Sequence, residues 1–438
     1  MAAAIPHQIG KYRILRELGR GATSTVYLAE DAFHRREVAI KVVQPGPETD
    51  TELQRRYRRV FMNEASLAGR LSHPHIVSIY DAATDDERSY LVMERVDGGT
   101  LEQYATADAL LPPSRLMEMM FKASVALDYA HRQGVIHCDI KPANILLTGD
   151  TDIKISDFGA AFVGAADHTF LQGVGSPAYM SPEQIQDRQV THQTDIYSLG
   201  VVMYQLLTGR LPFLGSSRGS LVYQIANIEA VPPSTHRRGL TPELDRIVLK
   251  AIAKSPDVRY RTWAEFSRDV AHAFRHLSVP TEEVSDTERF TMLRALELFR
   301  DFRDVELWEM LRVARWHRHP AGTQILREGE EGDSLFVLTA GEAKVSRSGQ
   351  VLDVLQTGQC FGEIAYFDES RGPRTTTITS STDSTAVELE ANAMRHASEA
   401  LQMQLNRAFI RVLLGRIDAR ESRMTSTDME QRPPEAGA

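Results

Sequence analysis

Hydrophobic and polar positions follow two different patterns in the first 277 residues. Short apolar or β-branched runs at 12–18, 25–29 and 37–43 are separated by Gly19, Gly21 and Asp31, which predicts three strands. From residue 52 to 71 the apolar positions recur at helical spacing instead. The same spacing predicts further helices near 114–133, 194–208, 242–253 and 263–277. The pattern thus indicates a strand-rich start followed by a helical region.

The pattern changes after residue 277. Residues 278–288 are rich in Pro, Thr, Ser and acids, which is typical of a linker. A helical entry is predicted near 299–316, and short strands with glycines at their turns then indicate a small β-roll. Residues 391–417 read as helical again. We therefore expect a flexible N-terminus at 1–10, a first domain at 11–277, a linker at 278–295, a second domain at 296–420 and a disordered tail at 421–438.

Composition and charge exclude several classes of protein. The chain has 438 residues, 42% of them hydrophobic and 25% charged, which are ordinary values for a globular protein. A net charge of −9 argues against a general nucleic-acid binder. The two cysteines, Cys138 and Cys360, form no disulfide framework and favour a reducing compartment. No signal peptide or membrane span is evident. We expect a cytoplasmic protein with no nucleic-acid partner.

A first group of motifs has the residues needed to handle a nucleoside triphosphate. The glycine-rich stretch GRGATSTV at 19–26 joins two predicted strands, and its backbone N–H groups suit phosphate oxygens. VAIK at 38–41 then places Lys41 at the end of an apolar strand, and Glu64 follows on the predicted helix. Either feature alone is weak evidence, because tight hairpins use glycine and most lysines lie at the surface.

Further motifs follow in a fixed order. They are HCDIKPAN at 137–144, DFG at 157–159, SPE at 181–183, DIYSLG at 195–200 and finally Arg259. Taken together, residues 11–277 resemble the serine/threonine protein kinases, in their bacterial eukaryotic-like branch. The resemblance implies a bilobal α+β fold and phosphate transfer from ATP to protein hydroxyls. It also implies a buried ion pair between Glu183 and Arg259.

The resemblance assigns a role to each motif residue. Lys41, held by Glu64, would bind the α- and β-phosphates, and Asp139 would accept the proton of the attacking hydroxyl. Lys141 would contact the γ-phosphate, which marks serine/threonine specificity. The remaining assignments are metal ligands for Mg²⁺ or Mn²⁺ at Asn144 and Asp157, and ATP contacts at Gly19, Gly21, Ser24, Val26, Ala39, Met93, Glu94, Val96 and Leu146.

Two positions depart from the family pattern. Ser24 replaces the third glycine of the loop. Cys138 replaces the arginine that usually gathers a phosphate on the activation loop, so the usual switch by phosphorylation of Thr169 or Ser176 is in question. His137, beside Asp139, is interpreted as a packing residue and not as a base. A pseudokinase is disfavoured because every residue that the chemistry needs is present.

A second group of motifs lies in the predicted β-roll. CFGEIAYF at 360–367 and PRTTTI at 373–378 resemble the phosphate-binding cassette of cyclic-nucleotide-binding domains. The resemblance implies that Glu363 accepts from a ribose hydroxyl and that Arg374 pairs with the cyclic phosphate. Gly362 begins the short helix whose N–H groups face the phosphate, and Thr375 matches members that also take cyclic GMP. Asp368, Glu369 and Ser370 lengthen the spacing, and Arg371 is a rival for the role of Arg374.

These observations lead to one main hypothesis and one alternative. The chain is expected to be a cytoplasmic serine/threonine kinase whose jelly-roll-like C-terminal β-roll binds cyclic AMP or cyclic GMP and regulates the kinase. Its partners would be proteins with accessible Ser or Thr, including a second copy through self-association and autophosphorylation. In the alternative, the β-roll is a ligand-free docking or dimerisation module.

Overall fold

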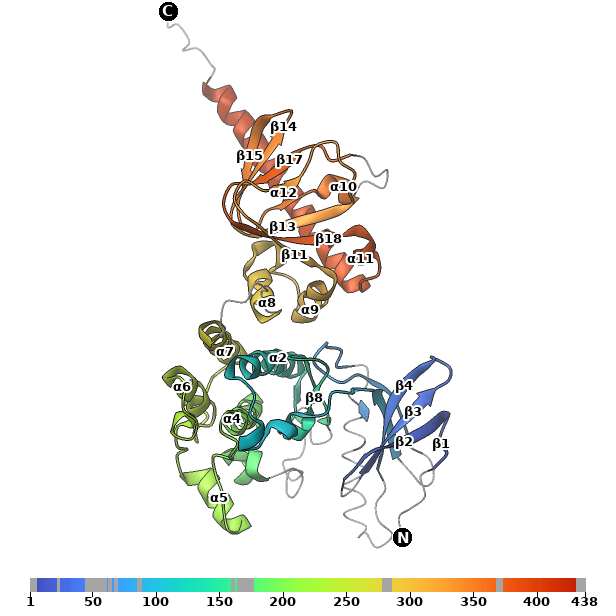
Figure 1. The fold of residues 1–438 in the computed structure, drawn as a ribbon, viewed down its shortest axis with the longest axis vertical. Coiled ribbons are helices and arrows are strands. Elements are labelled where there is room, and N and C mark those ends of the chain that lie inside the picture. Colours follow the sequence, from blue (N-terminus) through green and yellow to red (C-terminus); the bar gives the residue numbers. More distant parts are fainter. Residues whose placement is uncertain are drawn as a thin grey trace, which may run out of the picture. The chain divides into compact units, whose positions relative to one another are not determined.

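The chain forms two compact units, residues 1–282 and 283–438 (Figure 1). This computed structural model describes residues 6–21, 24–43, 61, 65–66, 70–84, 89–158, 162–163, 177–277, 286–367 and 373–430. Helix and sheet are both abundant, as the predicted α+β class requires. Each unit has a hydrophobic core of its own.

An antiparallel sheet opens the first unit. Its strand order is β1-β2-β3-β4-β6-β5. Tyr12, Ile40 and Val92 are buried on one face of this sheet and form a core cluster. The three predicted strands are confirmed as β2, β3 and β4. The sheet strands are β1 (Gln8–Ile9), β2 (Tyr12–Arg20), β3 (Ser24–Asp31), β4 (Arg36–Val43), β5 (Ile79–Thr84) and β6 (Ser89–Glu94).

The rest of the first unit is mainly helical. Helix α2 is buried over most of its length, and α4 begins at a capping box on Thr191 and ends at Gly209, whose φ of 73° suits glycine. The predicted helices are confirmed at these positions. The bounds are α2 (Pro113–Arg132), α3 (Pro182–Ile185), α4 (His192–Thr208), α5 (Arg218–Asn227), α6 (Pro242–Ala251) and α7 (Trp263–Leu277).

Short pieces between α2 and α4 position the motif residues. Strands β7 (Val135–Ile136) and β10 (Phe162–Val163) pair, as do β8 (Ile145–Leu147) and β9 (Ile153–Ile155). Between β7 and β8 lies the HCDIKPAN segment, which ends in the 3₁₀ helix η3 (Pro142–Asn144). Asp157 and Phe158 of the DFG motif follow β9 after one residue, Ser156. The β8–β9 hairpin and the β7–β10 pair therefore bring residues 137–144 and 157–158 close together, and His137 contacts Phe158.

Two four-stranded antiparallel sheets form the second unit. Their orders are β11-β18-β13-β16 and β12-β17-β14-β15, which confirms the expected β-roll. Phe336 and Phe361 stack in its core with ring centroids 5.2 Å apart. The strands are β11 (Arg315–His319), β12 (Gln324–Leu326), β13 (Ser334–Ala340), β14 (Ala343–Arg347), β15 (Gln350–Leu355), β16 (Cys360–Phe361), β17 (Thr377–Ser380) and β18 (Ser384–Glu390). The helices are α8 (Asp286–Ala295), α9 (Asp304–Val313), α10 (Glu363–Phe367), α11 (Ala391–Arg395) and α12 (Glu399–Glu430).

The second unit differs from the sequence prediction at its two ends. Residues 286–295, within the expected linker, form α8, because Phe290 is buried and stacks on Trp308 at 4.8 Å. The single helix expected at 299–316 is wrong: α9 spans only Asp304–Val313, and β11 then pairs with β18.

The C-terminal helix also differs from its prediction. The helix expected at 391–417 is broken at 396–398, where the Ser398 hydroxyl accepts from the Leu401 N–H and caps a new helix. That helix continues to Glu430, so residues 421–430 of the predicted disordered tail are helical, since extending a formed helix costs little.

Two other expectations concern helices. Most of the helix predicted at 52–71 lies outside the described residues. Among the residues that are described, no helix is both long and apolar enough to cross a membrane.

Candidate functional site

The buried carboxylate of Asp195 binds the backbone of His137 and Cys138. Asp195, at the start of α4, accepts hydrogen bonds from the N–H groups of His137 and Cys138, both at 2.8 Å. Burial raises the pKa of Asp195, while the neighbouring His137 and the two N–H donors act in the opposite direction. Cys138 has a φ of 64°, so Asp195 fixes this segment at a strained turn.

Two polar side chains of the HCDIKPAN segment, those of Lys141 and Asn144, converge on Asp139. The Lys141 ammonium donates to Asp139 Oδ2 at 2.7 Å. Asn144 donates from Nδ2 to the Asp139 carbonyl at 2.8 Å and to Oδ2 at 3.2 Å. The Asp139 side chain is 12% exposed. The sequence spacing thus produces a carboxylate that is oriented by hydrogen bonds from Lys141 and Asn144 and remains partly accessible to a substrate.

Lys41 and Asp157, 116 residues apart, are brought into contact. Lys41 Nζ donates to Asp157 Oδ1 at 2.6 Å. Desolvation alone would raise the pKa of Asp157. The charge and the hydrogen bond of Lys41 outweigh this effect, and with the charges of His137 and Lys141 they lower the pKa below its ordinary value. The net result is a carboxylate held ionised. The backbone of Asp157 has a φ of 64°, which turns the chain after β9. The next residue, Phe158, packs beside His137 with ring centroids 4.5 Å apart.

The donor set fits a hard divalent cation. The nitrogen of the Asn144 amide is used toward Asp139, so its oxygen is the atom that can bind a cation. Asp157 adds an ionised carboxylate, and oxygen ligands of this kind are what Mg²⁺ and Mn²⁺ prefer. No cluster of three or more His, Cys, Asp or Glu ligands occurs among the described residues. A cation here would therefore need oxygens from a bound phosphate as well.

The residues expected around adenine lie on neighbouring elements. Ala39 pairs with Met93 across β4 and β6, and Leu146 bridges to Thr100. Glu94 accepts from Lys154 Nζ at 2.9 Å, which fixes the start of the segment that includes Val96. The loop glycines lie at the β2–β3 turn, where the Gly21 N–H donates to the Ser24 carbonyl at 2.8 Å. Gly19 and Val26 are opposite each other in the same pair of strands.

Several expected residues fall outside the described part of the chain. Glu64, the expected partner of Lys41, is one of them, and so are Thr169, Ser176 and Arg371. Asp368, Glu369 and Ser370 also lie there.

The expected ion pair between Glu183 and Arg259 is confirmed. Arg259 donates from Nη1 and Nη2 to the two carboxylate oxygens at 2.6 and 2.7 Å. Burial raises the pKa of Glu183, but the guanidinium lowers it below its ordinary value. Arg259 also donates to the carbonyls of Ala253, Lys254 and Gln193, so it joins three segments of the helical region.

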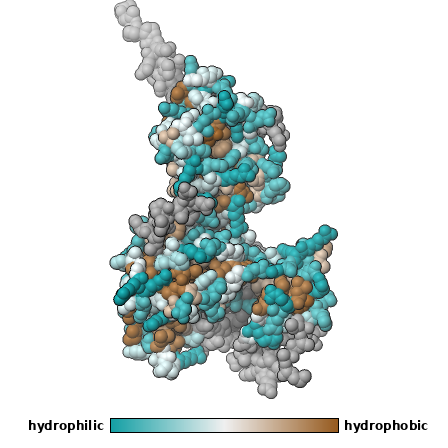
Figure 2. Space-filling model, viewed as in Figure 1, coloured by the Kyte–Doolittle hydropathy of each residue, from teal (hydrophilic) through white to brown (hydrophobic). Residues whose placement is uncertain are grey.

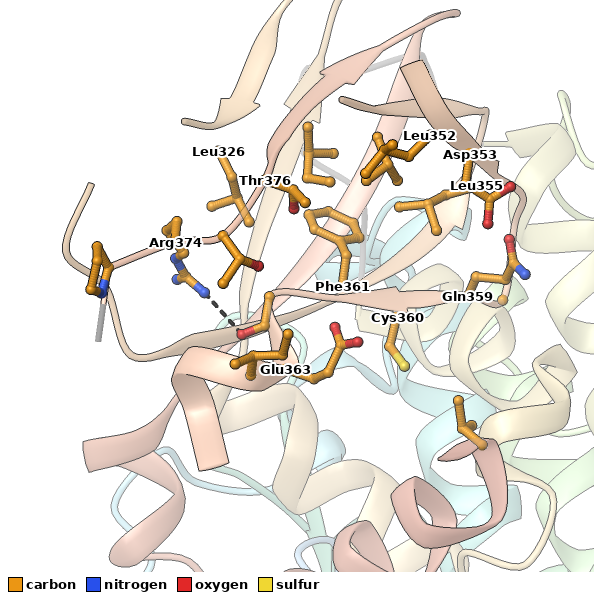
Figure 3. A pocket seen from close by; sticks show the side chains of 18 of the residues that line it. Leu326, Leu352, Asp353, Leu355, Gln359, Cys360, Phe361, Glu363, Arg374 and Thr376 are labelled. Atoms are coloured by element: carbon orange, nitrogen blue, oxygen red, sulfur yellow. Dashed lines mark hydrogen bonds between the residues drawn. The ribbon is translucent and has the colours of Figure 1, made fainter. Parts of the chain in front are cut away.

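The second unit contains a cavity of about 960 Å³, bordered by β15, β16, α10 and α12. All four residues expected to bind a cyclic nucleotide line it: Gly362, Glu363, Arg374 and Thr375. Apolar walls come from Leu326, Leu352, Leu355 and Phe361 (Figure 3). A volume of this size accommodates a nucleotide.

Arg374 is a buried cation in this cavity wall. It is 7% exposed, and its Nη1 donates to the carbonyls of Ser334 at 2.8 Å and Gly362 at 2.9 Å (Figure 3). Desolvation lowers the pKa of Arg374, whereas the nearby Glu388, Asp333 and Glu363 raise it. Both hydrogen-bond acceptors are neutral. An anion that binds in the cavity would therefore gain from this charge.

Sequence reasoning missed two residues of these sites. Asp195 is part of the DIYSLG motif, but spacing in the sequence does not predict that it binds the His137 backbone. The one signal for such a role was an acidic residue near the start of a mostly apolar helix. Gly332 is one of the glycines that the sequence pattern assigned only to turns of the β-roll. A Cβ at Gly332 would lie 2.8 Å from Arg374 Nη2, and one at Gly362 would lie 2.8 Å from Nη1, so two glycines make room for the guanidinium.

Comparison with known proteins identifies a domain family in each of the two units. Residues 12–274 match the protein kinase domain, and residues 316–400 match the cyclic nucleotide-binding domain. The chain is 38% identical to the serine/threonine-protein kinase PknB of Mycobacterium leprae, over 66% of this chain and 47% of that protein. It is 39% identical to the serine/threonine-protein kinase PrkC of Bacillus subtilis, over 67% of this chain and 45% of that protein.

A probable serine/threonine-protein kinase of Streptomyces coelicolor is 41% identical over 60% of this chain and 39% of its own length. The alignments thus span about half, or less, of these curated relatives. The kinase match covers more than half of the present chain. The chain belongs to the protein kinase domain family, resembles bacterial serine/threonine kinases in particular, and includes a cyclic nucleotide-binding domain in its second unit.

Proposed function

We propose that this chain is an ATP-dependent serine/threonine protein kinase regulated by a cyclic nucleotide bound in its second unit. The observation that supports the kinase activity best is the convergence of Lys141 and Asn144 on Asp139, together with the contact between Lys41 and Asp157. These five side chains come from three separate motifs, VAIK, HCDIKPAN and DFG, and a purely structural role would not need their charges to face one another.

The proposed reaction is in-line transfer of the γ-phosphate. The substrate hydroxyl oxygen forms a bond to the γ-phosphorus while the bond to the bridging oxygen breaks, and ADP leaves. Asp139 accepts the hydroxyl proton, and Lys141 stabilises negative charge on the γ-phosphate. Lys41 holds the α- and β-phosphates, with Glu64 proposed to orient it. A cation on Asn144 and Asp157 would supply charge neutralisation between the β- and γ-phosphates.

We assign the nucleotide base of ATP to the residues around β4 and β8. Adenine would contact Val26, Ala39 and Leu146. Met93 would be the gatekeeper residue at the inner end of the adenine site, and the hinge segment Glu94 to Val96 would lie along the edge of the base. Gly19, Gly21 and Ser24 would cover the phosphates. Protein substrates with an accessible Ser or Thr, including Thr169 and Ser176 of a second copy, complete the proposal, and we place the activity in the cytoplasm.

In the second unit we assign a cyclic nucleotide to the cavity of about 960 Å³. Arg374 would pair with the cyclic phosphate, and Glu363, at the start of α10, would accept from the ribose hydroxyl. The burial of Arg374 supports this assignment, because the hydrogen-bond acceptors of its guanidinium among the described residues are the neutral carbonyls of Ser334 and Gly362, which do not cancel its charge toward an anion. Thr375 is compatible with cyclic GMP as well as cyclic AMP.

The test is transfer of radiolabelled phosphate from ATP by the full-length protein, with and without cyclic AMP or cyclic GMP. We expect transfer to a Ser/Thr substrate, a rate that changes with one nucleotide, and no transfer by Asp157→Asn. In Arg374→Ala the basal rate should remain and the nucleotide response should vanish. Because Arg374 is buried, Glu363→Gln serves as a milder second variant, which should weaken the response.

Each part of the proposal can fail separately. Transfer that persists in Asp157→Asn would contradict the assigned kinase site. An active enzyme that ignores both nucleotides, and shows no heat of binding with either, would contradict the sensor and favour the docking alternative.

A further inference from the structure

An acidic side chain lies on the inner face of one sheet of the second unit. In the order β11-β18-β13-β16, Glu388 of β18 is directly opposite Phe336 of β13, and Phe336 is directly opposite Phe361 of β16. Residues directly opposite each other in an antiparallel pair point to the same face of the sheet. Phe336 and Phe361 belong to the core, and Phe361 lines the cavity. Glu388 therefore faces the interior of the β-roll.

A histidine of the edge strand β11 contacts this carboxylate. His317 is opposite Ala386, which is two residues from Glu388 and so shares its face. His317 Nε2 lies 2.8 Å from Glu388 Oε2, and the side chains of His317 and Glu388 are 38% and 17% exposed. Figure 2 shows a mainly hydrophilic outer surface on the second unit, where most charged side chains belong. A carboxylate that faces inward instead is costly unless a positive charge lies near it.

Arg374 is the permanent cation near Glu388. The guanidinium carbon of Arg374 lies 5.9 Å from the ring centroid of Phe336, the residue opposite Glu388. Desolvation lowers the pKa of Arg374, and the charge of Glu388 acts in the opposite direction. Among the described residues, Arg374 donates its hydrogen bonds to the carbonyls of Ser334 and Gly362. Glu388 thus acts on Arg374 through its charge and not through a hydrogen bond.

Such a carboxylate has opposite effects on the empty and the occupied site. In the empty site, Glu388 compensates the buried charge of Arg374. When an anion binds beside Arg374, Glu388 repels this anion, and the repulsion is screened less in the interior than in water. A neutral side chain at position 388 would therefore favour the bound anion. A proton on His317 has the same effect, because it places a positive charge 2.8 Å from the carboxylate.

The other charged groups near this cluster have different positions or partners. Among the described residues they are Asp333 and Glu363 near Arg374, the pair Arg315–Glu390, and, on the other face of β11, Arg318 and Arg289, which lies over the Trp316 ring. His319 stacks beside His317 with ring centroids 6.0 Å apart. Desolvation and the charge of His317 lower the pKa of His319, so His319 takes up a proton only at a lower pH than an ordinary histidine.

We propose that Glu388 and His317 set the affinity of the anion site at Arg374: Glu388 opposes a bound anion, and a proton on His317 relieves this opposition. The inference rests on the proposed function, because it takes the anion to be the phosphate of a cyclic nucleotide. It adds a dependence on pH. As the pH falls through the range in which histidine gains a proton, the cavity binds the nucleotide more tightly. The cyclic phosphate is a diester with one negative charge throughout this range, so the change comes from the protein.

A double-mutant cycle tests the charge coupling without any nucleotide. In calorimetric melting of the full-length protein, Glu388→Gln should lower the melting temperature of the second unit, because Arg374 loses a compensating charge. In the Arg374→Gln background the same change should lower the melting temperature less, since the cation is then absent. Equal decreases in the two backgrounds would overturn the coupling.

Isothermal titration with cyclic AMP and with cyclic GMP measures the effect on binding. At pH 7.5, Glu388→Gln should bind the preferred nucleotide at least about 3-fold more tightly than the wild type. Glu390→Gln is the matched control, because Glu390 lies on the same strand and face but is paired with Arg315, and its affinity should equal that of the wild type. Weaker binding by Glu388→Gln would show that Glu388 holds Arg374 in place, and would overturn the proposal.

The pH profile of the affinity tests the part assigned to His317. Between pH 7.5 and pH 6.0 the wild type should gain at least about 3-fold in affinity, and His317→Gln should gain none. His396→Gln changes an exposed histidine outside this sheet and should retain the gain. Identical profiles for the wild type and His317→Gln would overturn the role of His317. A wild type that binds neither nucleotide would contradict the proposed function, whereas the double-mutant cycle would still decide the coupling between Glu388 and Arg374.

Discussion

At the scale of single residues, the Glu183–Arg259 pair should contribute strongly to stability. Both side chains are almost completely buried, and removing the cation leaves a carboxylate without compensation. Arg259→Met should therefore lower the free energy of unfolding of the first unit by about 3–5 kcal/mol. Urea unfolding of residues 1–282, followed through the fluorescence of Trp263, measures this change.

Arg246→Met is the matched control. Arg246 pairs with Asp269 at 2.8 Å, but its side chain is 54% exposed. Loss of an exposed pair should cost no more than about 1 kcal/mol. Equal losses in the two variants would contradict the argument from burial.

A second residue-scale prediction concerns pH. Nε2 of His319, at the end of β11, is buried and has no hydrogen-bond partner among the described residues. Desolvation and the neighbouring His317 lower the pKa of His319 below 6.5. The unfolded chain therefore binds a proton on this residue before the folded chain does. Its contribution to stability is complete above about pH 6.5 and declines as the pH falls below that value.

Thermal melting of the second unit between pH 7.5 and pH 5 tests this prediction, with the pH range set by the ordinary histidine pKa of about 6.5. His319→Gln removes the titrating group, so the melting temperature of this variant should fall less steeply with decreasing pH. Parallel curves for wild type and variant would show that His319 has no part in the pH dependence.

Residue-scale prediction from the sequence worked where a motif is short and self-contained. Asp139, Lys141 and Asn144 are at most five residues apart, so their convergence follows from one local turn. The contact between Lys41 and Asp157 was not predicted, because the resemblance assigned Lys41 to Glu64 and Asp157 to a metal ion, and the two positions are 116 residues apart. The bonds from Arg374 to the Ser334 and Gly362 carbonyls depend on tertiary packing and could not be read from spacing.

At the scale of elements, the contact between α4 and α6 depends on a missing side chain. A Cβ at Gly200 would lie 2.7 Å from Ala251 Cβ and 2.8 Å from Ile252 Cγ2. Gly200→Ala should force the elements apart and cost about 1–3 kcal/mol, less the gain of about 0.5–1 kcal/mol from helix propensity. Urea unfolding of residues 1–282 should show the net loss.

Gly219→Ala in α5 provides the opposite case. A Cβ there would meet only the Ser217 hydroxyl at 4.0 Å. This variant should gain about 0.5–1 kcal/mol, because alanine restricts the unfolded chain and favours the helix. If both variants shifted the unfolding midpoint in the same direction, the close approach of α4 and α6 would not be the cause.

Element positions were predictable where apolar spacing was regular. The strands β2 to β4 and the helices α2, α4, α6 and α7 lie close to their predicted positions. The break before α12 was not, because it depends on Glu309 of α9, which accepts from both the N–H and the hydroxyl of Ser398. A contact across 89 residues has no local pattern.

At the scale of the whole molecule, the two units have separate cores, so the first should fold and act without the second. We expect residues 1–282 to phosphorylate a Ser/Thr substrate and to melt cooperatively. A ligand shifts an equilibrium only through its different affinities for two states. Because the cavity lies entirely in the second unit, the shortened protein should give the same rate with and without cyclic AMP or cyclic GMP.

The full-length protein provides the comparison for this prediction. The rate of the full-length protein should change with one nucleotide, and the Arg374→Ala variant of the full-length protein should show no such change. The rate of residues 1–282 serves as the reference for an unregulated kinase. If the shortened protein is slower than the unliganded full-length chain, the second unit activates, and if it is faster, the second unit inhibits. A nucleotide response that persists in residues 1–282 would move the regulatory site to the kinase unit and contradict the assignment of the cavity.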